Sequence, residues 1–216
     1  MHPLPLSLLF LVMLSGSGCG PNRAYVEYLK GNEAFESMDH EKAMAHYNES
    51  LALDSSNAEA YLGRGRIHWL FLQHKQVVPN MTRALELDPN LAWAYYFRGI
   101  SLMNLNDLEA GIDDLTGSLA TNALPDDFRL RALHFRGIGY MNLARYDAAI
   151  NDLDACIALD PDQPLYRFER GTLYEASGRA DAAIGDYEAF LAQSFDENER
   201  TEQVRAKLGV LRGTLE

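Results

Sequence analysis

The feature that most constrains this chain is a glycine, preceded by Lys or Arg, that recurs at a nearly fixed interval. The dipeptides are Lys30-Gly31, Arg64-Gly65, Arg98-Gly99, Arg136-Gly137 and Arg170-Gly171, with successive spacings of 34, 34, 38 and 34 residues. A period of this length is typical of arrays in which each repeat is a hairpin of two helices. The sequence therefore predicts an all-α solenoid of stacked hairpins rather than one globular core.

Each unit repeats the same order of residue types after the glycine. In the fourth unit Gly137 is followed by Tyr140, Ala149 and Pro161. Small residues let two helices pack closely, and proline ends the second helix. This order and period resemble the tetratricopeptide-repeat (TPR) family, which implies a right-handed superhelix of about five units over residues 24–197. The expected units are about 24–57, 58–91, 92–129, 130–163 and 164–197.

Two segments depart from the regular period. The 38-residue spacing contains four extra residues, which we place around residues 122–129, where Pro125 excludes a continuous helix. After the last unit, residues 198–216 have apolar side chains at helical spacing. These side chains are Val204, Leu208 and Leu211. We expect this segment to be the capping helix that an open array requires.

Three of the arginines in this phase have an aspartate 16 residues further along the chain. The pairs are Arg98–Asp114, Arg136–Asp152 and Arg170–Asp186. In a helix hairpin this spacing places the aspartate on the second helix, near the arginine of the first. We expect structural ion pairs inside the units, which specify geometry more than they add net stability.

The first residues differ from the rest of the chain. Residues 4–14 (LPLSLLFLVML) form an apolar run that is shorter than the roughly 20 residues a spanning helix needs. Small residues follow, so residues 1–18 are expected to be an export signal and residues 19–23 a short tether. Cys19 resembles the lipobox cysteine of bacterial lipoproteins, which implies that its thiol is lipidated.

The resemblance to a lipobox leaves an alternative open. Gly16 stands where that motif usually has Leu, and no Lys or Arg precedes the apolar run. A secreted or periplasmic protein without a lipid anchor is therefore the alternative to an anchored protein of the cell envelope. Gly20 follows the cysteine where Asp would favour an inner membrane, which favours an outer membrane.

Charge and motifs argue against several classes of function. The net charge of −12 and the isoelectric point near 4.9 disfavour nucleic acid, which rewards clustered Lys and Arg. The sequence has no Walker A, zinc-protease, nucleophile-elbow or C-x-x-C motif. His68 and His74 are six residues apart and do not share one helical face. We expect no catalysis, no cofactor and no metal.

Binding is expected on the face that the first helix of each unit presents to a concave groove, as the resemblance implies. The groove residues are Tyr25, Tyr28, Asn32, Phe35, Leu62, Arg66, Trp69, Trp93, Tyr96, Ile100, Met103, His134, Ile138, Met141 and Phe168. Equivalent positions hold Glu59, Arg131, Leu165, Thr172 and Glu175. Aromatic and Met side chains mark adaptable binding surfaces. We expect an apolar or aromatic peptide segment, with a basic element attracted by the acidic surroundings.

Members of the family that bind the acidic C-termini of chaperones use a clamp of Lys, Asn, Asn, Lys and Arg. The matching positions here are Tyr28, Asn32, Gly63, Trp93 and Phe97, so only one clamp residue is retained. The resemblance therefore implies an adaptor or scaffold without this clamp, assisting assembly of an envelope complex. The structural alternative is a self-associating protein whose groove holds the terminus of another copy.

Overall fold

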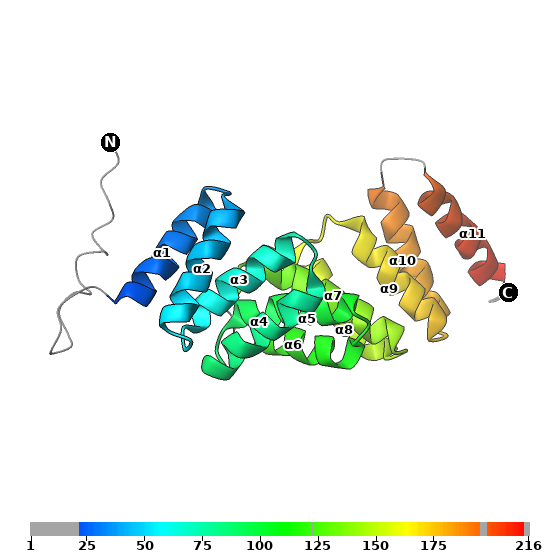
Figure 1. Ribbon diagram of the computed structural model, residues 1–216. Coiled ribbons are helices and arrows are strands. Elements are labelled where there is room, and N and C mark those ends of the chain that lie inside the picture. Colours follow the sequence, from blue (N-terminus) through cyan, green and yellow to red (C-terminus); the bar gives the residue numbers. More distant parts are fainter. Residues whose placement is uncertain (1–21, 122, 195–197, 214–216) are drawn as a thin grey trace.

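The computed structural model describes residues 22–121, 123–194 and 198–213. In these ranges the chain is a row of helices without strands (Figure 1). The helices are α1 (Arg23–Glu36), α2 (His40–Leu53), α3 (Ala58–Leu70), α4 (His74–Leu87), α5 (Ala92–Asn104), α6 (Leu108–Ala120), α7 (Asp126–Asn142), α8 (Tyr146–Leu159), α9 (Pro164–Ala176), α10 (Ala180–Gln193) and α11 (Glu199–Gly213). The predicted signal peptide and Cys19 lie outside the described residues.

Consecutive helices pair into five hairpins, from α1 with α2 to α9 with α10. Each hairpin then packs on the next through α2 and α3, α4 and α5, α6 and α7, and α8 and α9. The two ends of the row lie far apart, as in a solenoid (Figure 1). The predicted all-α solenoid of five hairpins is therefore confirmed.

Short polar side chains fix where several helices begin. The side chains of Asn22, Asp39 and Asn57 accept hydrogen bonds from backbone N–H groups in the first turns of α1, α2 and α3. These bonds satisfy donors that have no partner inside a helix. At the other end, α4 and α8 stop at residues with extended or near-extended backbone just before Pro89 and Pro161. This is the termination that the repeated proline predicts.

The turn inside each hairpin needs one residue with a left-handed backbone. The residues are Met38, Leu72, Asn106, Ala144 and Gly178, with φ between 54° and 75°. Only Gly178 adopts this conformation without a steric cost, since it has no Cβ. The other turns are therefore held by the packing of the helices they join.

The four extra residues of the third interval lengthen a helix. Helix α7 has 17 residues, whereas the other hairpin helices have 13 or 14. Pro125 is its N-cap, because a proline without an N–H costs nothing at a helix start. The boundary that we expected between the third and fourth units, after residue 129, therefore lies inside α7. The helix begins about one turn earlier, at Asp126.

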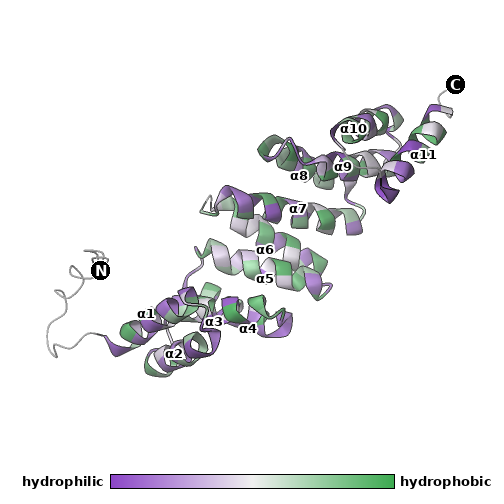
Figure 2. Ribbon diagram, turned by 90° about the horizontal axis from the view of Figure 1, so that it is seen from above, coloured by the Kyte–Doolittle hydropathy of each residue, from purple (hydrophilic) through white to green (hydrophobic). Residues whose placement is uncertain are grey.

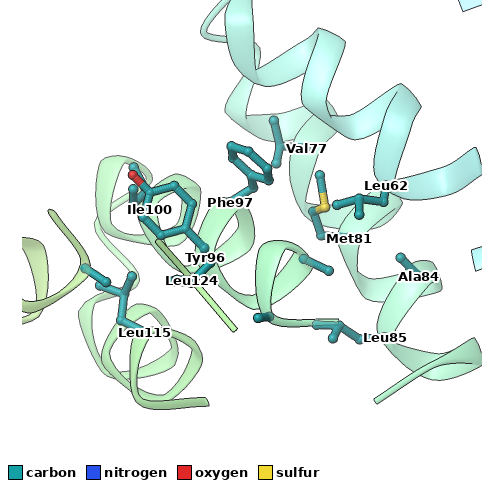
Figure 3. Close-up of a cluster of buried hydrophobic side chains, with 13 residues drawn as sticks. Leu62, Val77, Met81, Ala84, Leu85, Tyr96, Phe97, Ile100, Leu115 and Leu124 are labelled. Carbon is teal, nitrogen blue, oxygen red and sulfur yellow. The ribbon is translucent and has the colours of Figure 1, made fainter. Parts of the chain in front are cut away.

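Apolar side chains fill the space between hairpins. One cluster joins α3, α4, α5, α6 and α7, and Figure 3 shows Phe97 of α5 reaching toward Val77 and Met81 of α4. Hydrophobic and hydrophilic residues both occur along the helices (Figure 2), as expected for helices with one packed face. At the C-terminal end, Val204 and Leu208 of α11 are buried against α10, so α11 is the predicted capping helix.

Candidate peptide-binding face

The odd-numbered helices approach one another along one side of the array. Helix α1 packs on α3, α3 on α5, and α5 on α7. An array curves toward the side on which its helices are closer, so these helices line its inner side. We call the surface that carries the predicted groove residues on α1, α3, α5, α7 and α9 the inner face.

Three of the predicted groove residues are not available on the inner face. Leu62, Tyr96 and Ile100 are only 7%, 1% and 3% exposed and belong to the core cluster between the second and third hairpins. Side chains of neighbouring helices in the same cluster cover them. These three positions are therefore core residues rather than groove residues.

The other predicted groove residues keep part of their surface open to solvent. Tyr25 and Met141 are exposed. The half-buried ones are Tyr28, Asn32, Phe35, Arg66, Trp69, Trp93, Met103, His134, Ile138 and Phe168. The inner face is thus a partly exposed surface that carries many aromatic side chains.

Three half-exposed aromatic rings from α3, α5 and α7 gather at the centre of this surface around the buried ring of Phe97. Trp69 lies 5.1 Å from Phe97 between ring centroids, and Trp93 stacks on Phe97 at 5.7 Å. Phe128 meets Trp93 edge to face at 4.6 Å. We call Trp69, Trp93, Phe97 and Phe128 the aromatic cluster. The indole N–H of Trp69 has no hydrogen-bond partner among the described residues.

Phe128 is the member that sequence reasoning missed. It lies in the added turn of α7, in a segment that the repeat spacing presents as a connection. A proline followed by two aspartates is a typical helix start, since acidic residues favour the first turn. That pattern at Pro125 was the signal that could have placed Phe128 on a helix.

Two carboxylates on the inner face already have partners. Glu169 accepts a hydrogen bond from the ring of His134 at 2.7 Å. Glu175 is bound by Lys207 of α11 at 2.6 Å and by the hydroxyl of Tyr187 at 2.6 Å. Burial opposes ionisation of Glu175, but these two bonds outweigh it and hold its pKa below the usual value.

Two arginines on the inner face lie on aromatic rings instead. The guanidinium of Arg66 sits 4.4 Å above the ring of Phe35, and that of Arg131 sits 5.7 Å from the ring of Phe128. Neither forms an ion pair with a carboxylate in the described part of the chain. Their cations flank the aromatic cluster on α3 and α7.

The arginines on the opposite side of the first helices behave differently. Each joins an acceptor on its own second helix to one on the second helix of the preceding unit. The triads are Asn48–Arg64–Asn80, Thr82–Arg98–Asp114, Thr116–Arg136–Asp152 and Asp154–Arg170–Asp186. We call this set the arginine ladder.

The ladder contains all three pairs that the 16-residue spacing predicts. Each aspartate receives two hydrogen bonds from its arginine, at 2.6–2.9 Å. The hydrogen bond that Arg98 donates to Asp114 raises the pKa of Arg98, whereas burial lowers the pKa of Arg64, whose ladder partners are uncharged asparagines. The ladder therefore fixes the stacking of the hairpins and holds its arginines against the second helices, away from the inner face.

Nothing in the described ranges suggests catalysis at a metal or a thiolate. No group of three His, Cys, Asp or Glu side chains is placed to hold a metal ion there. Burial raises the pKa of Cys156 to about 12, so its thiol stays protonated at neutral pH. No helix in these ranges is long and apolar enough to cross a bilayer.

Comparison with known proteins agrees with this geometry. The sequence model described as TPR repeat matches residues 31–70, and the one described as Tetratricopeptide repeat matches residues 137–209. The chain carries tetratricopeptide repeats. The TPR chain is also similar to solved structures of repeat proteins at low sequence identity, which shows the fold alone.

Three of these structures cover most of the chain. YrrB, described as a TPR protein with an unusual peptide-binding site, has a TM-score of 0.76 at 21% identity over 85% of this chain and 93% of its own. MamA has a TM-score of 0.70 at 22% identity, covering 81% and 93%. PilW, described as a type IV pilus biogenesis factor, has a TM-score of 0.62 at 18% identity, covering 88% and 86%.

The curated relatives match over short regions. Sperm-associated antigen 1 of Mus musculus is 35% identical over 40% of this chain, and serine/threonine-protein phosphatase 5 of Homo sapiens is 31% identical over 39%. The matches span only 9% and 17% of those proteins. A match to so small a part of a phosphatase is no evidence of phosphatase activity.

Proposed function

We propose that this TPR chain is a non-catalytic adaptor that holds a peptide or protein segment against its inner face. The observation that carries the proposal is the aromatic cluster, in which Trp69, Trp93 and Phe128 stay half-exposed on the surface of the array. Exposed apolar surface of this kind marks interaction sites, and aromatic residues supply most binding energy in interfaces. The peptide-binding site described for YrrB, a TPR protein of the same fold, supports this use of the surface.

Partner capture tests the groove assignment. Crosslinking with mass spectrometry would compare the intact protein with Trp69→Ala, Trp93→Ala and the control Met38→Ala. Met38 is exposed at the turn between α1 and α2 and is not one of the groove residues. We expect the tryptophan variants to lose partners that the wild type and the control retain. Equal capture by all four proteins would refute the binding face.

We also propose that the adaptor is a lipid-anchored protein of a bacterial cell envelope that assists assembly of an envelope complex. The order of the apolar run, small residues and Cys19 supports an anchor, and PilW, a pilus biogenesis factor of this fold, supports an assembly role. Replacing Cys19 with Ser and following membrane fractionation tests the anchor. Membrane association that is unchanged in Cys19→Ser would exclude lipidation, and a monomer in light scattering would exclude a groove filled by another copy.

A further inference from the structure

The arginines of this chain are divided between two sides of the array. On the ladder side, Arg98, Arg136 and Arg170 each bind an aspartate through two hydrogen bonds. On the inner face, Arg66 and Arg131 lie against phenylalanine rings and meet no carboxylate in the described ranges. In a chain with 31 acidic and 19 basic residues, two inner-face arginines that pair with no carboxylate are unexpected.

Two acidic side chains of the inner face already have charged or hydrogen-bonding partners. Glu169 is engaged by His134, and Glu175 by Lys207 and Tyr187. Glu59 remains exposed, and although partial desolvation and the nearby Asp88 raise its pKa, the charge of Arg66 acts on it in the opposite direction without forming an ion pair. The inner face therefore carries two arginines that form no ion pair in the described ranges, although Arg66 lies near Glu59, Arg131 lies near the hydroxyl of Tyr96, and the protein as a whole is acidic.

Stacking on a ring leaves an arginine able to bind a carboxylate. The ring of Phe35 or Phe128 covers one face of the guanidinium, while the N–H donors point outward in its plane. Those donors match the two oxygens of a carboxylate, and the ring holds the side chain in place in advance. The chemistry of the site is thus an apolar centre, the aromatic cluster, with a carboxylate receptor on each side.

We propose that the inner face takes a peptide segment in which acidic residues flank apolar or aromatic ones, with Arg66 and Arg131 binding the carboxylates. The proposal rests on the peptide-binding function above and specifies the partner's chemistry. It uses different residues from the chaperone clamp, whose positions here are Tyr28, Asn32, Gly63, Trp93 and Phe97. It also reverses the preference for a basic element that the net charge of −12 suggests.

Fluorescence anisotropy with three labelled synthetic peptides tests this charge preference on the intact protein. The peptides share the same apolar and aromatic residues, and their polar positions are all Glu, all Ser or all Lys. Long-range attraction to an acidic protein would favour the Lys peptide. We expect the opposite order, with the Glu peptide tightest and the Lys peptide weakest. Any other order, or no binding of all three, would overturn the proposal.

Matched variants then test whether the preference for the Glu peptide depends on Arg66 and Arg131. Arg66→Gln and Arg131→Gln should each weaken the Glu peptide by about tenfold and leave the Ser peptide within about twofold. Arg145→Gln removes the same charge at the start of α8, where Arg145 binds Glu109 at 3.0 Å, and should change neither. Equal losses in all three variants would show that only overall charge matters. If Trp69→Ala lost captured partners while the arginine variants bound normally, the charge assignment would fail and the groove function would survive.

Discussion

At the scale of single residues, most glycines at the helix crossings lie where an added Cβ would meet an atom of a facing helix. Added Cβ atoms at Gly31 and Gly63 would both lie within 2.6 Å of the ring of Tyr47, so one side chain accounts for two glycines. At Gly99 an added Cβ would lie 3.1 Å from the backbone oxygen of Gly111. Gly137 is the exception, because its nearest neighbour would be Asp152 Cβ at 3.5 Å, an ordinary contact.

Gly99 and Gly137 therefore predict opposite effects of alanine. Gly99→Ala should lower the free energy of unfolding by about 1–3 kcal/mol, since a rigid backbone atom cannot yield. Gly137→Ala should raise it by about 0.5–1 kcal/mol, because alanine favours the helix and meets no clash. Urea unfolding followed by circular dichroism measures both. If Gly137→Ala were less stable than the wild type, α7 and α8 would pack more closely at Gly137 than the 3.5 Å contact indicates.

Tyr47 also predicts how stability depends on alkaline pH. Burial raises its pKa from 10 to about 12, and its hydroxyl donates to Asn32 at 2.8 Å. A folded-state pKa above the unfolded one contributes stability that is complete below about pH 10 and is lost as pH rises through about 12. We expect a loss of about 2 kcal/mol from Tyr47 across this window.

The control for this window is Tyr47→Phe. It is less stable at neutral pH because it loses the bond to Asn32, but its stability should fall less steeply between about pH 10 and pH 12. Urea unfolding at several pH values compares the two slopes. Equal slopes would mean that Tyr47 does not resist ionisation in the folded protein.

At the scale of helices, the sequence predicted which side chains pair across a hairpin only where the two residues carry opposite charges. The interval of 16 residues identified the Arg–Asp pairs, because opposite charges at that spacing meet across a hairpin. The same interval joins Arg64 to Asn80, which was missed because asparagine carries no charge. Helix α7 was misjudged at its start, since Pro125 fits both a break in a helix and an N-cap.

A double-mutant cycle on Arg136 and Asp152 measures the interaction free energy of one ion pair in the arginine ladder. Asp152 is 4% exposed, so Arg136→Leu leaves a buried carboxylate without its cation. Each of Arg136→Leu and Asp152→Leu should cost about 3 kcal/mol, and the double variant should cost less than their sum. Thermal unfolding gives the four values. The exposed pair Arg145–Glu109 is the control and should contribute less than about 1 kcal/mol.

At the scale of the whole molecule, the glycine phase predicted the number and order of hairpins, because each unit contacts only its neighbours. The spacing of the glycines did not predict which groove residues remain accessible to solvent. Tyr96 and Ile100 occupy groove positions in sequence and are covered by neighbouring helices in space. Exposure on the inner face depends on how tightly successive units wind, which arises from contacts between units.

The same nearest-neighbour organisation predicts a local effect of damaging the cap. Leu208→Asp places a charge in the buried contact between α11 and α10, and Val210→Asp on the same helix is the control, since Val210 is 67% exposed. Amide hydrogen exchange should become faster in α9 and α10 of Leu208→Asp and stay unchanged in α1–α4. Uniformly faster exchange would show that the array unfolds as one unit.

The arginine ladder has a consequence for how such a chain changes in length. The second helices α4, α6 and α8 each carry two acceptors two residues apart, one for the arginine of the same unit and one for the arginine of the next unit. Thr82 and Thr116 present the same hydroxyl to the arginine that follows. Removing or duplicating one whole unit between them is therefore expected to leave a threonine hydroxyl facing an arginine at the new junction, so the ladder hydrogen bonds tolerate a change in the number of units.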